Sequence, residues 1–232
     1  MLKVKLFRAI DDLESCQRFA EGHANVLRDY GVTKVTSAKH DWFHNPGVYV
    51  ALVLSEDESV VYGGERVHIA HADHPLPIEL AVGIVEPNIY PLIKSYKEQG
   101  ITGELCGLWN SKSIAGKGVA ILLTKIGVAI ANILKMDSLF VLCAPYTVSM
   151  CQHAGFEIET SIGNQGTFYY PKLDLIATSL VVKDLIHLPH ANPAFREQIL
   201  HLTKNPYSTS TEKGPKGSIE VELDLNLNLP VT

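Results

Sequence analysis

The hydrophobic pattern of the N-terminal part of the chain predicts a strand, a helix and a β-hairpin. Residues 4–10 form a short β-rich run. Apolar side chains then recur at helical spacing through residues 13–30, which predicts an amphipathic helix. Two further β-rich runs, 48–54 and 60–69, flank a short polar turn and read as a hairpin.

The middle of the chain predicts a strand, a glycine-containing turn and a long apolar helix. The strand ends at Trp109, the turn holds Gly116 and Gly118, and the helix covers residues 119–134. A glycine lets a ligand approach the backbone closely, and a helix N-terminus presents unpaired N–H groups with a partial positive charge. The turn is therefore a plausible cradle for a diphosphate. It matches neither the P-loop pattern nor the dinucleotide-binding fingerprint.

The chain after this helix continues with alternating strands and helices. The predicted elements are a strand 138–143, a helix 145–154, strands 158–162, 167–170 and 175–182, and a helix 193–202. The polar stretch 205–217 is rich in Ser, Thr, Lys and Pro and reads as a mobile linker.

The last segment, residues 219–229, alternates strictly between aliphatic and polar side chains. The aliphatic positions are Ile219, Val221, Leu223, Leu225, Leu227 and Leu229. A period of two predicts a strand with one apolar face. Each aliphatic side chain left in water would forfeit roughly 1.5–3 kcal/mol. The strand must therefore join its own sheet or pair with a second subunit in a homodimer.

The central turn and the segment after it resemble the GNAT acyltransferase superfamily. The superfamily's turn reads Arg/Gln-x-x-Gly-x-Gly/Ala, and here Ala115, Gly118 and Ala120 occupy its three positions. The helix 145–154 ends in Gly155-Phe156, as the superfamily's second block does. The resemblance implies an α/β (α+β) fold in which a mixed central sheet is flanked by helices.

The resemblance also divides the chain. Residues 1–185 are expected to form the acyltransferase domain, and residues 186–232 a C-terminal extension. Residues 71–100 lengthen the usual connection before the core strand. A connection of this length is either a substrate-facing element or a packed insertion without function, and the sequence leaves both readings open.

Composition and charge argue against nucleic acid and membranes as partners. The 232 residues are 46% hydrophobic, enough to bury a substantial core, and their net charge of −5 argues against a nucleic-acid partner. The N-terminus has no signal-peptide pattern, and the most apolar run is too short and too interrupted for a membrane span. Three of the four cysteines lie in apolar segments and are interpreted as reduced core residues, so we expect a cytoplasmic protein without a membrane association.

The superfamily supplies candidate roles for individual residues. Glu104 alternates with Cys106, Leu108 and Asn110 on one predicted strand face and is the candidate general base. Cys151 holds the position of the superfamily's thiol-protonating Tyr, and Tyr146 is a second candidate acid. The resemblance assigns coenzyme A contacts to Leu108, Trp109, Asn110, Ala115, Gly116, Lys117, Gly118, Val119, Ala120 and Ile121. Although His68, His71 and His74 are evenly spaced, no metal site is expected.

Three functions are compatible with these features. The leading one is an acyl-CoA-dependent N-acyltransferase that moves an acyl group, in the simplest version acetyl from acetyl-CoA, to a small-molecule or peptide amine by direct attack in a ternary complex. The second is a long-chain N-acyl synthase using acyl-CoA or acyl carrier protein. The insertion and Glu104-x-x-x-Leu108 resemble the N-acyl amino acid and acyl-homoserine-lactone synthases, which carry Arg in place of Gly107. The third is a non-catalytic acyl-CoA-binding or interaction protein.

Overall fold

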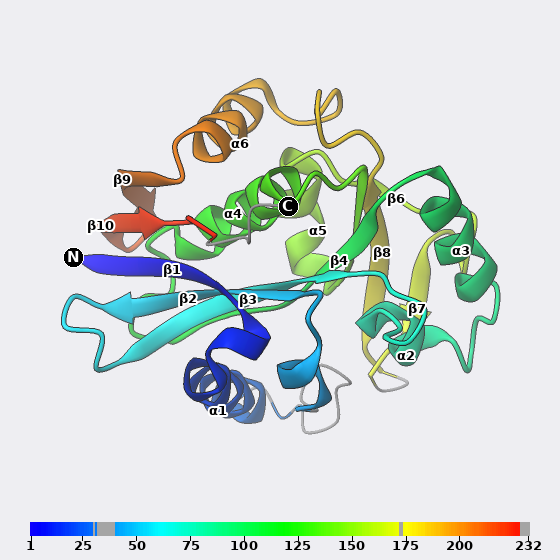
Figure 1. The fold of residues 1–232 in the computed structure, drawn as a ribbon, viewed down its shortest axis with the longest axis horizontal. Helices are drawn as coiled ribbons and strands as arrows, with labels where there is room; N and C mark the ends of the chain where they lie inside the picture. The colour runs from blue at the N-terminus through cyan, green and yellow to red at the C-terminus, as the bar shows by residue number, and fades with distance from the viewer. Residues whose placement is uncertain (30, 32–39, 172–173, 228–232) are drawn as a thin grey trace.

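One mixed β-sheet runs through the molecule (Figure 1). The computed structural model describes residues 1–29, 31, 40–171 and 174–227. The strands of this part are β1 (Leu2–Arg8), β2 (Val48–Ser55), β3 (Val61–Ile69), β4 (Thr102–Asn110), β5 (Ser138–Cys143), β6 (Glu157–Ile158), β7 (Thr167–Tyr169), β8 (Ile176–Val182), β9 (Tyr207–Gly214) and β10 (Gly217–Asp224).

The helices cover both faces of this sheet. They are α1 (Leu13–Asp29), α2 (Pro77–Val82), α3 (Ile89–Gln99), α4 (Val119–Ile133), α5 (Pro145–His153) and α6 (Pro193–Lys204), with 3-10 turns at Ala9–Asp11 and Asp41–His44. Figure 1 shows α1 on one face, α4 and α6 on the other, and α2 with α3 at the far end of the sheet. The predicted helix ranges correspond to α1, α4, α5 and α6, whereas α2 and α3 lie inside the insertion.

The strand order is β6-β8-β5-β4-β3-β2-β1-β10-β9, and β7 pairs with β8. Strands β1 to β4 are antiparallel neighbours, whereas β4 and β5 are parallel. A parallel pair needs a crossover, and α4 supplies it. The expectation of a mixed sheet flanked by helices is confirmed. The strand expected at 158–162 is wrong beyond its start, because only Glu157–Ile158 pairs with β8.

Helix α4 is buried on all sides from Leu122 to Ala131, which explains its continuous apolar sequence. One side of it packs on the sheet at Gly127, where an added Cβ would lie 2.6 Å from the Leu105 side chain of β4. The other side is covered by the C-terminal segments. Figure 1 shows α4 lying between the sheet and α6, with β9 and β10 beside it.

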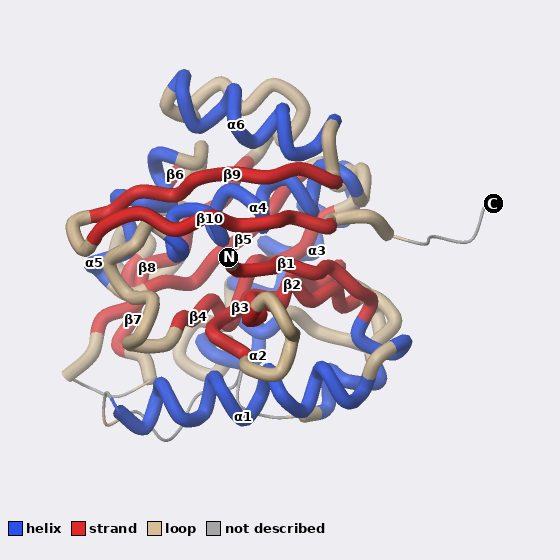
Figure 2. Tube along the Cα trace, turned by 90° about the vertical axis from the view of Figure 1, so that its left-hand side faces the viewer, coloured by secondary structure: helices blue, strands red, loops and turns tan. Residues whose placement is uncertain are grey.

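The alternating C-terminal segment joins its own sheet. Strand β10 pairs in parallel with β1, and Leu2 lies opposite Val221. Val221, Leu223 and Leu225 are buried in the main core, so the own-sheet alternative is confirmed for the described residues. Figure 2 shows β9, β10, β1 and β2 side by side. The last two residues of the expected strand 219–229 lie outside the described part of the chain.

The expectation of a linker at residues 205–217 is wrong. Residues Tyr207–Gly214 form β9, which pairs in antiparallel fashion with β10 across a tight turn. Polar Ser and Thr side chains are compatible with β9 because it is an edge strand whose burial alternates between half-buried and exposed. The inward-facing Glu212 forms an ion pair with Lys125 of α4 at 3.5 Å.

The insertion 71–100 folds as α2 and α3 over the far half of the sheet. Ile78, Ile89 and Ile93 are buried and form one cluster with Phe140 of β5 and neighbouring residues of β7 and β8. The cluster lies on the opposite face from α4. The insertion is therefore a packed part of the domain that closes one face over β4 and β5.

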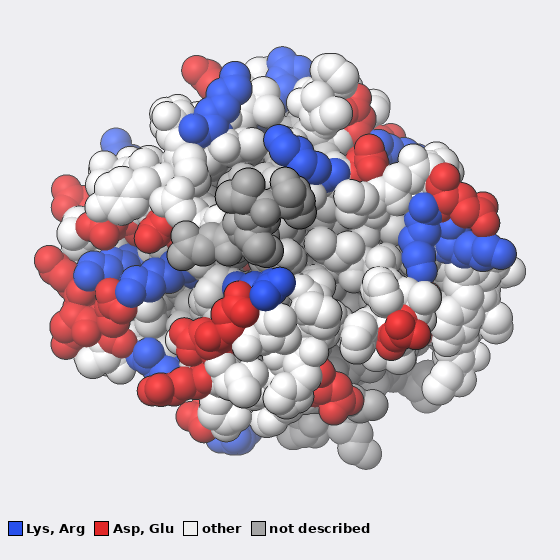
Figure 3. All heavy atoms as spheres, in the orientation of Figure 1, with Lys and Arg blue, Asp and Glu red and all other residues white. Residues whose placement is uncertain are grey.

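The surface mixes charges of both signs over the face seen in Figure 3. On β1, for example, Lys3 and Lys5 both pair with Glu58 of the β2–β3 turn. None of the helices described here is long and apolar enough to cross a membrane.

Glu212→Gln is expected to lower the free energy of unfolding by about 3 kcal/mol, because it removes the negative charge that compensates the buried Lys125 ammonium. Urea denaturation measures the change. The matched control is Glu98→Gln, since the pair of Glu98 with Lys94 is exposed and is worth less than about 0.5 kcal/mol. Equal small losses in both variants would contradict a buried ion pair that holds β9 to α4.

Candidate active site

The parallel strands β4 and β5 diverge halfway along their length. Their ladder ends at the pair Leu105–Val141, although β4 continues to Asn110 and β5 to Cys143. A bulge in β4 accompanies the divergence, because Gly107 and Leu108 together lie opposite Glu65 of β3. Gly107 has a φ of 60°, which favours glycine. Because the strands diverge, one backbone edge of β4 has no strand partner beyond Leu105. A ligand that inserts between two strands needs such a free edge.

The bulge also changes which face each β4 side chain occupies. The sequence places Glu104, Cys106, Leu108 and Asn110 on one face, and this is wrong beyond Cys106. Leu108 packs against the main core on the α4 side. Trp109 lies on the opposite side, where its indole packs in the core against α1.

The start of α4 lies at the open end of the diverging strands. Val119, Ala120 and Ile121 form its first turn, and their N–H groups have no intrahelical acceptor. Gly118 immediately before them has a φ of 90°, and Gly116 one of 81°. Ile121 is 39% exposed at this helix start. The anion cradle expected at residues 115–121 stays a prediction.

The turn between β9 and β10 packs directly on the two cradle glycines. The N–H of Lys216 donates to the carbonyl of Gly116 at 2.9 Å. A Cβ on Gly118 would lie 2.8 Å from the carbonyl oxygen of Lys213, and one on Gly116 would lie 2.9 Å from the Lys216 side chain. Glycine is thus needed at both positions to make room for the hairpin of this chain. The sequence analysis had instead explained these glycines by the close approach of a ligand.

Glu104 lies on the face of the sheet that α1 and the insertion cover. It is 2% exposed, and its Oε2 accepts a hydrogen bond of 2.6 Å from the N–H of Ile78 at the start of α2. Burial raises the pKa of Glu104 from 4.5 to about 8, and the Ile78 bond and the Arg66 charge oppose this shift. A carboxyl group poised near neutral pH fits a general base. The same contact also anchors α2.

Strand β3 carries charged side chains that the sequence analysis did not select. Glu65 and Arg66 are 0% exposed and point to opposite faces of the sheet. The Arg66 guanidinium stacks on Trp42 with its Cζ 4.2 Å from the ring centroid. His68 lies next to it, and burial lowers the pKa of His68 well below its ordinary value. Two adjacent charges inside an apolar strand were the signal that could have drawn attention to this cluster.

The two candidate acids occupy different environments. Cys151 on α5 is 3% exposed and faces the core beneath α4, whereas Tyr146 is 85% exposed. The neighbouring thiol of Cys143, at the end of β5, raises the pKa of Cys151, and burial raises it further. Conversely, Cys151 lowers the pKa of Cys143. Cys151 is thus buried against the Cys143 thiol at the end of β5, whereas Tyr146 faces solvent.

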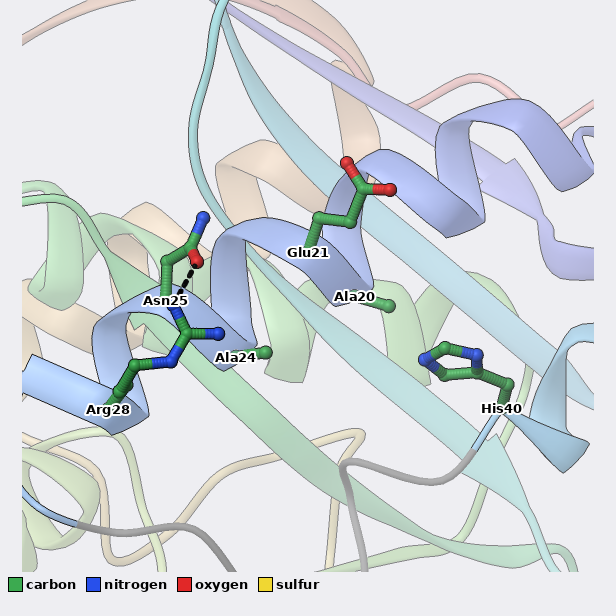
Figure 4. Close-up of a pocket in the computed structure, with 6 residues that line it drawn as sticks. All are labelled: Ala20, Glu21, Ala24, Asn25, Arg28 and His40. Atoms are coloured by element: carbon green, nitrogen blue, oxygen red, sulfur yellow. Dashed lines mark hydrogen bonds between the residues drawn. The ribbon is translucent and has the colours of Figure 1, made fainter.

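A separate surface pocket of about 370 Å³ lies on α1 (Figure 4). Its lining residues are Ala20, Glu21, Ala24, Asn25, Arg28 and His40. Arg28 donates to Asn25 at 3.1 Å within this wall. No residue selected from the sequence lines it, so the pocket is distinct from the cradle at α4.

In the part of the chain that the structure describes, no group of three or more His, Cys, Asp or Glu side chains is arranged to hold a metal ion. His68 is buried on β3 opposite Glu104, while His71 and His74 lie beyond the strand with their rings 6.1 Å apart. The evenly spaced histidines are therefore not gathered at one point.

The diverging parallel strands, the bulge and the helix that begins at their open end define the fold of the GNAT acyltransferases, as the resemblance implied. Among solved structures, the chain is similar to FeeM, an N-acyl amino acid synthase from uncultured soil microbes. That match has a TM-score of 0.63 and 13% identity and covers 85% of this chain and 98% of FeeM.

Two other solved structures show the same fold. BjaI, a CoA-dependent acyl-homoserine lactone synthase solved with SAM and isopentyl-CoA, matches with a TM-score of 0.54 and 11% identity over 100% of this chain and 95% of BjaI. An acyl-CoA N-acyltransferase from Pseudomonas aeruginosa matches with a TM-score of 0.56 and 10% identity over 78% of this chain and 99% of that one. No family model and no curated sequence matches the chain.

Glu104→Gln is expected to flatten the fall in stability between pH 4.5 and about 8. The folded protein holds a proton on Glu104 in this interval that the unfolded chain releases, so the contribution of Glu104 is full below pH 4.5 and is lost as pH rises through about 8. One such group changes the free energy of unfolding by roughly 1.4 kcal/mol per pH unit. Urea denaturation across this range measures it, and parallel curves for the two proteins would contradict the raised pKa.

Proposed function

We propose that this protein is an acyl-CoA-dependent N-acyltransferase that transfers an acyl group from a coenzyme A thioester to an amine by direct attack in a ternary complex. The observation that carries the proposal is the parting of β4 from β5 beside the first turn of α4. An extended thioester arm fits between diverging strands, and a diphosphate fits a helix N-terminus. The solved structures with this fold include enzymes that are named for this reaction.

The residues divide into three tasks in this proposal. The N–H groups of Val119, Ala120 and Ile121 hold the diphosphate. The free edge of β4 at residues 108–110 offers backbone donors to the oxyanion that develops on the thioester carbonyl. Glu104, on the opposite face, removes the proton from the attacking amine. The acceptor approaches from the face covered by α1 and the insertion, because Glu104 lies there.

A longer acyl chain is the second candidate, and one contact favours it. The synthases of the second resemblance carry Arg where this chain has Gly107. Here the guanidinium of Arg66 reaches the same place from β3, since its Nε and Nη2 lie 3.2 Å from the position of a Cβ on Gly107. A positive charge is thus present at the bulge although β4 itself lacks it. The matches to FeeM and BjaI are compatible with this branch.

Acyl-CoA thioesters are expected to raise the melting temperature of the protein. Ligand at 100 times its dissociation constant stabilises by about 2.7 kcal/mol, or roughly 5–10 °C for a chain of this size. The measurement compares CoA, acetyl-CoA and a long-chain acyl-CoA. A shift with acetyl-CoA supports an acetyltransferase, and a shift confined to the long chain supports the synthase branch. The absence of a shift with all three would contradict the proposed function.

Ile121→Glu is the matched test of the cradle, and Ile121→Gln is its control. Ile121 is exposed in the first turn of α4, where a carboxylate stabilises the helix slightly but repels phosphate. Both variants should fold like the parent protein. The Glu variant should lose at least about tenfold in CoA affinity by calorimetry, a cost of about 1.4 kcal/mol. Equal affinities in the two variants would place the diphosphate elsewhere.

The rate of acyl transfer is expected to rise with pH and to level off above about pH 8, because Glu104 must be ionised to accept the proton and its pKa is about 8. Glu104→Gln should lower kcat by roughly 10²–10⁴-fold and remove this inflection. CoA release is followed with a thiol reagent, using an acceptor whose own amine pKa lies well away from 8. If the variant keeps both CoA binding and turnover, Glu104 is not the general base and its role is limited to the structural hydrogen bond with Ile78.

If CoA binds but no amine is acylated, the result would favour the third function, a non-catalytic protein that binds acyl-CoA. The hydrogen bond from Ile78 to Glu104 is the feature that favours it, because this bond gives Glu104 a structural task without any reaction.

A further inference from the structure

Two thiols meet at the end of β5. Cys143 is the last residue of this strand, and Cys151 follows it on α5. Their side chains are joined by a hydrogen bond in which the S–H of Cys151 donates to the sulfur of Cys143. The Thr147 hydroxyl, one helical turn before Cys151, also lies within hydrogen-bonding reach of Cys143. The groups of α5 that contact Cys143 therefore share one face of the helix.

The register of the sheet places Cys143 on the same side independently. Side chains alternate between the two faces along a strand, so Cys143 shares a face with Leu139 and Val141 of β5. Both of these residues are buried in the main core together with Cys151, and Cys143 packs against that core. Cys143 lies opposite Thr178 of β8, which holds this end of β5 in the sheet. The contact between the two thiols thus follows from the topology.

The two thiols differ in how easily they react. Cys143 is half-buried, so a small molecule can reach its sulfur, whereas Cys151 is 3% exposed. The hydrogen bond from Cys151 stabilises the thiolate of Cys143 and lowers the pKa of Cys143, while the same neighbour raises the pKa of Cys151. A thiolate is the nucleophilic form of cysteine. The accessible thiol of the pair is therefore also the more reactive one.

We propose that Cys143 and Cys151 are an oxidation site at which hydrogen peroxide forms a reversible disulfide. The Cys143 thiolate attacks one peroxide oxygen and the O–O bond breaks. Cys143 becomes a sulfenic acid, and the departing hydroxide combines with the proton that Cys143 had lost to give water. The sulfur of Cys151 then displaces hydroxide from the sulfenic sulfur, and the proton of Cys151 completes a second water. Two thiols are oxidised to one disulfide, and the peroxide is reduced to water.

The order of these steps fits the environment of the second thiol. The Cys143 thiol is the largest cause of the raised pKa of Cys151. Oxidation of Cys143 removes the neighbouring thiolate, so Cys151 loses its proton more easily once the sulfenic acid has formed. Cys151 is already in contact with the sulfur that it must attack, and the disulfide needs no rearrangement of α5 to form.

The two remaining cysteines lie on the other face of the sheet. Cys16 of α1 is buried and donates to the carbonyl of Ala9 at 3.4 Å. Cys106 of β4 is buried beside the guanidinium of Arg66. Both should stay reduced under conditions that oxidise the pair, and they serve as internal controls in the same molecule.

The disulfide would fix a part of β5 that β4 does not hold. Val141 is the last residue of β5 that pairs with β4, and Cys143 lies beyond it. A bond to Cys151 ties this end of the strand to α5. The inference does not depend on the proposed function, because the reaction requires no acyl-CoA. Failure of either one leaves the other standing.

Peptide mapping of the full-length protein tests the proposal. The reduced protein is treated with hydrogen peroxide at neutral pH, its remaining thiols are alkylated, and it is digested with chymotrypsin. Cleavage after Tyr146 separates the two cysteines unless a disulfide joins their peptides. The joined peptides should appear with peroxide and disappear with dithiothreitol, while Cys16 and Cys106 are alkylated throughout. Sulfinic acid on Cys143 beside an alkylated Cys151, or a disulfide with another partner, would overturn the proposal.

Single variants test the order of the two steps. Cys151→Ala should accumulate the sulfenic acid on Cys143, which dimedone traps. Cys143→Ser should slow the reaction of Cys151 with peroxide at least about tenfold, because the reactive thiolate is gone. Cys106→Ala is the matched control and should form the disulfide as the parent protein does. Equal oxidation of Cys151 with and without Cys143 would overturn the proposal, and the mapping of the parent protein decides it even where a variant fails to fold.

Discussion

The parting of β4 from β5 is the constraint on which the arrangement of the chain depends. Once the ladder ends at Leu105 and Val141, the backbone edge of β4 needs either a ligand or water as its partner. The bulge at Gly107 bends β4 at this point and reverses the faces of the residues that follow. Helix α4 must then begin beside the opening, because it is the crossover that makes β4 and β5 parallel. The opening, the helix start and the reversed side chains are thus consequences of one irregularity.

A second consequence is that the sheet separates two buried acidic groups. Glu104 lies before the bulge and faces the insertion, where one backbone N–H partly compensates it. Glu65 lies opposite the bulge and faces α4 with no such donor among the described residues. Both carboxyl groups keep their protons to higher pH than usual because burial disfavours the charged form. An apolar side chain of similar size would avoid this cost of burial at either position.

The sequence predicted the elements that have a local hydrophobic pattern. It missed those whose structure depends on pairing or packing with other segments. The strict alternation of residues 219–229 was enough to predict a paired strand, because its apolar face had to be covered. Strand β9 was missed since its Ser, Thr and Lys residues fit an exposed edge as well as a linker. Helix α2 was too short for a periodic signal. At the site, the turn and Glu104 could be found from a motif and an alternation. Glu65 and Arg66 stand out in the sequence only as two adjacent charges in an apolar strand, because the register of β3 against the β4 bulge gives them their positions.

The C-terminal hairpin changes how the cradle itself is understood. Gly116 and Gly118 looked like openings for a ligand, yet the backbone around Lys213 and Lys216 lies against them. The hairpin is fixed at its other end by β1 and, through Glu212, by the buried Lys125 of α4. It therefore links the N-terminal edge of the sheet to the first turn of α4. If the first turn of α4 holds the diphosphate as proposed, the C-terminal extension supports that site through its contacts with Gly116 and Gly118.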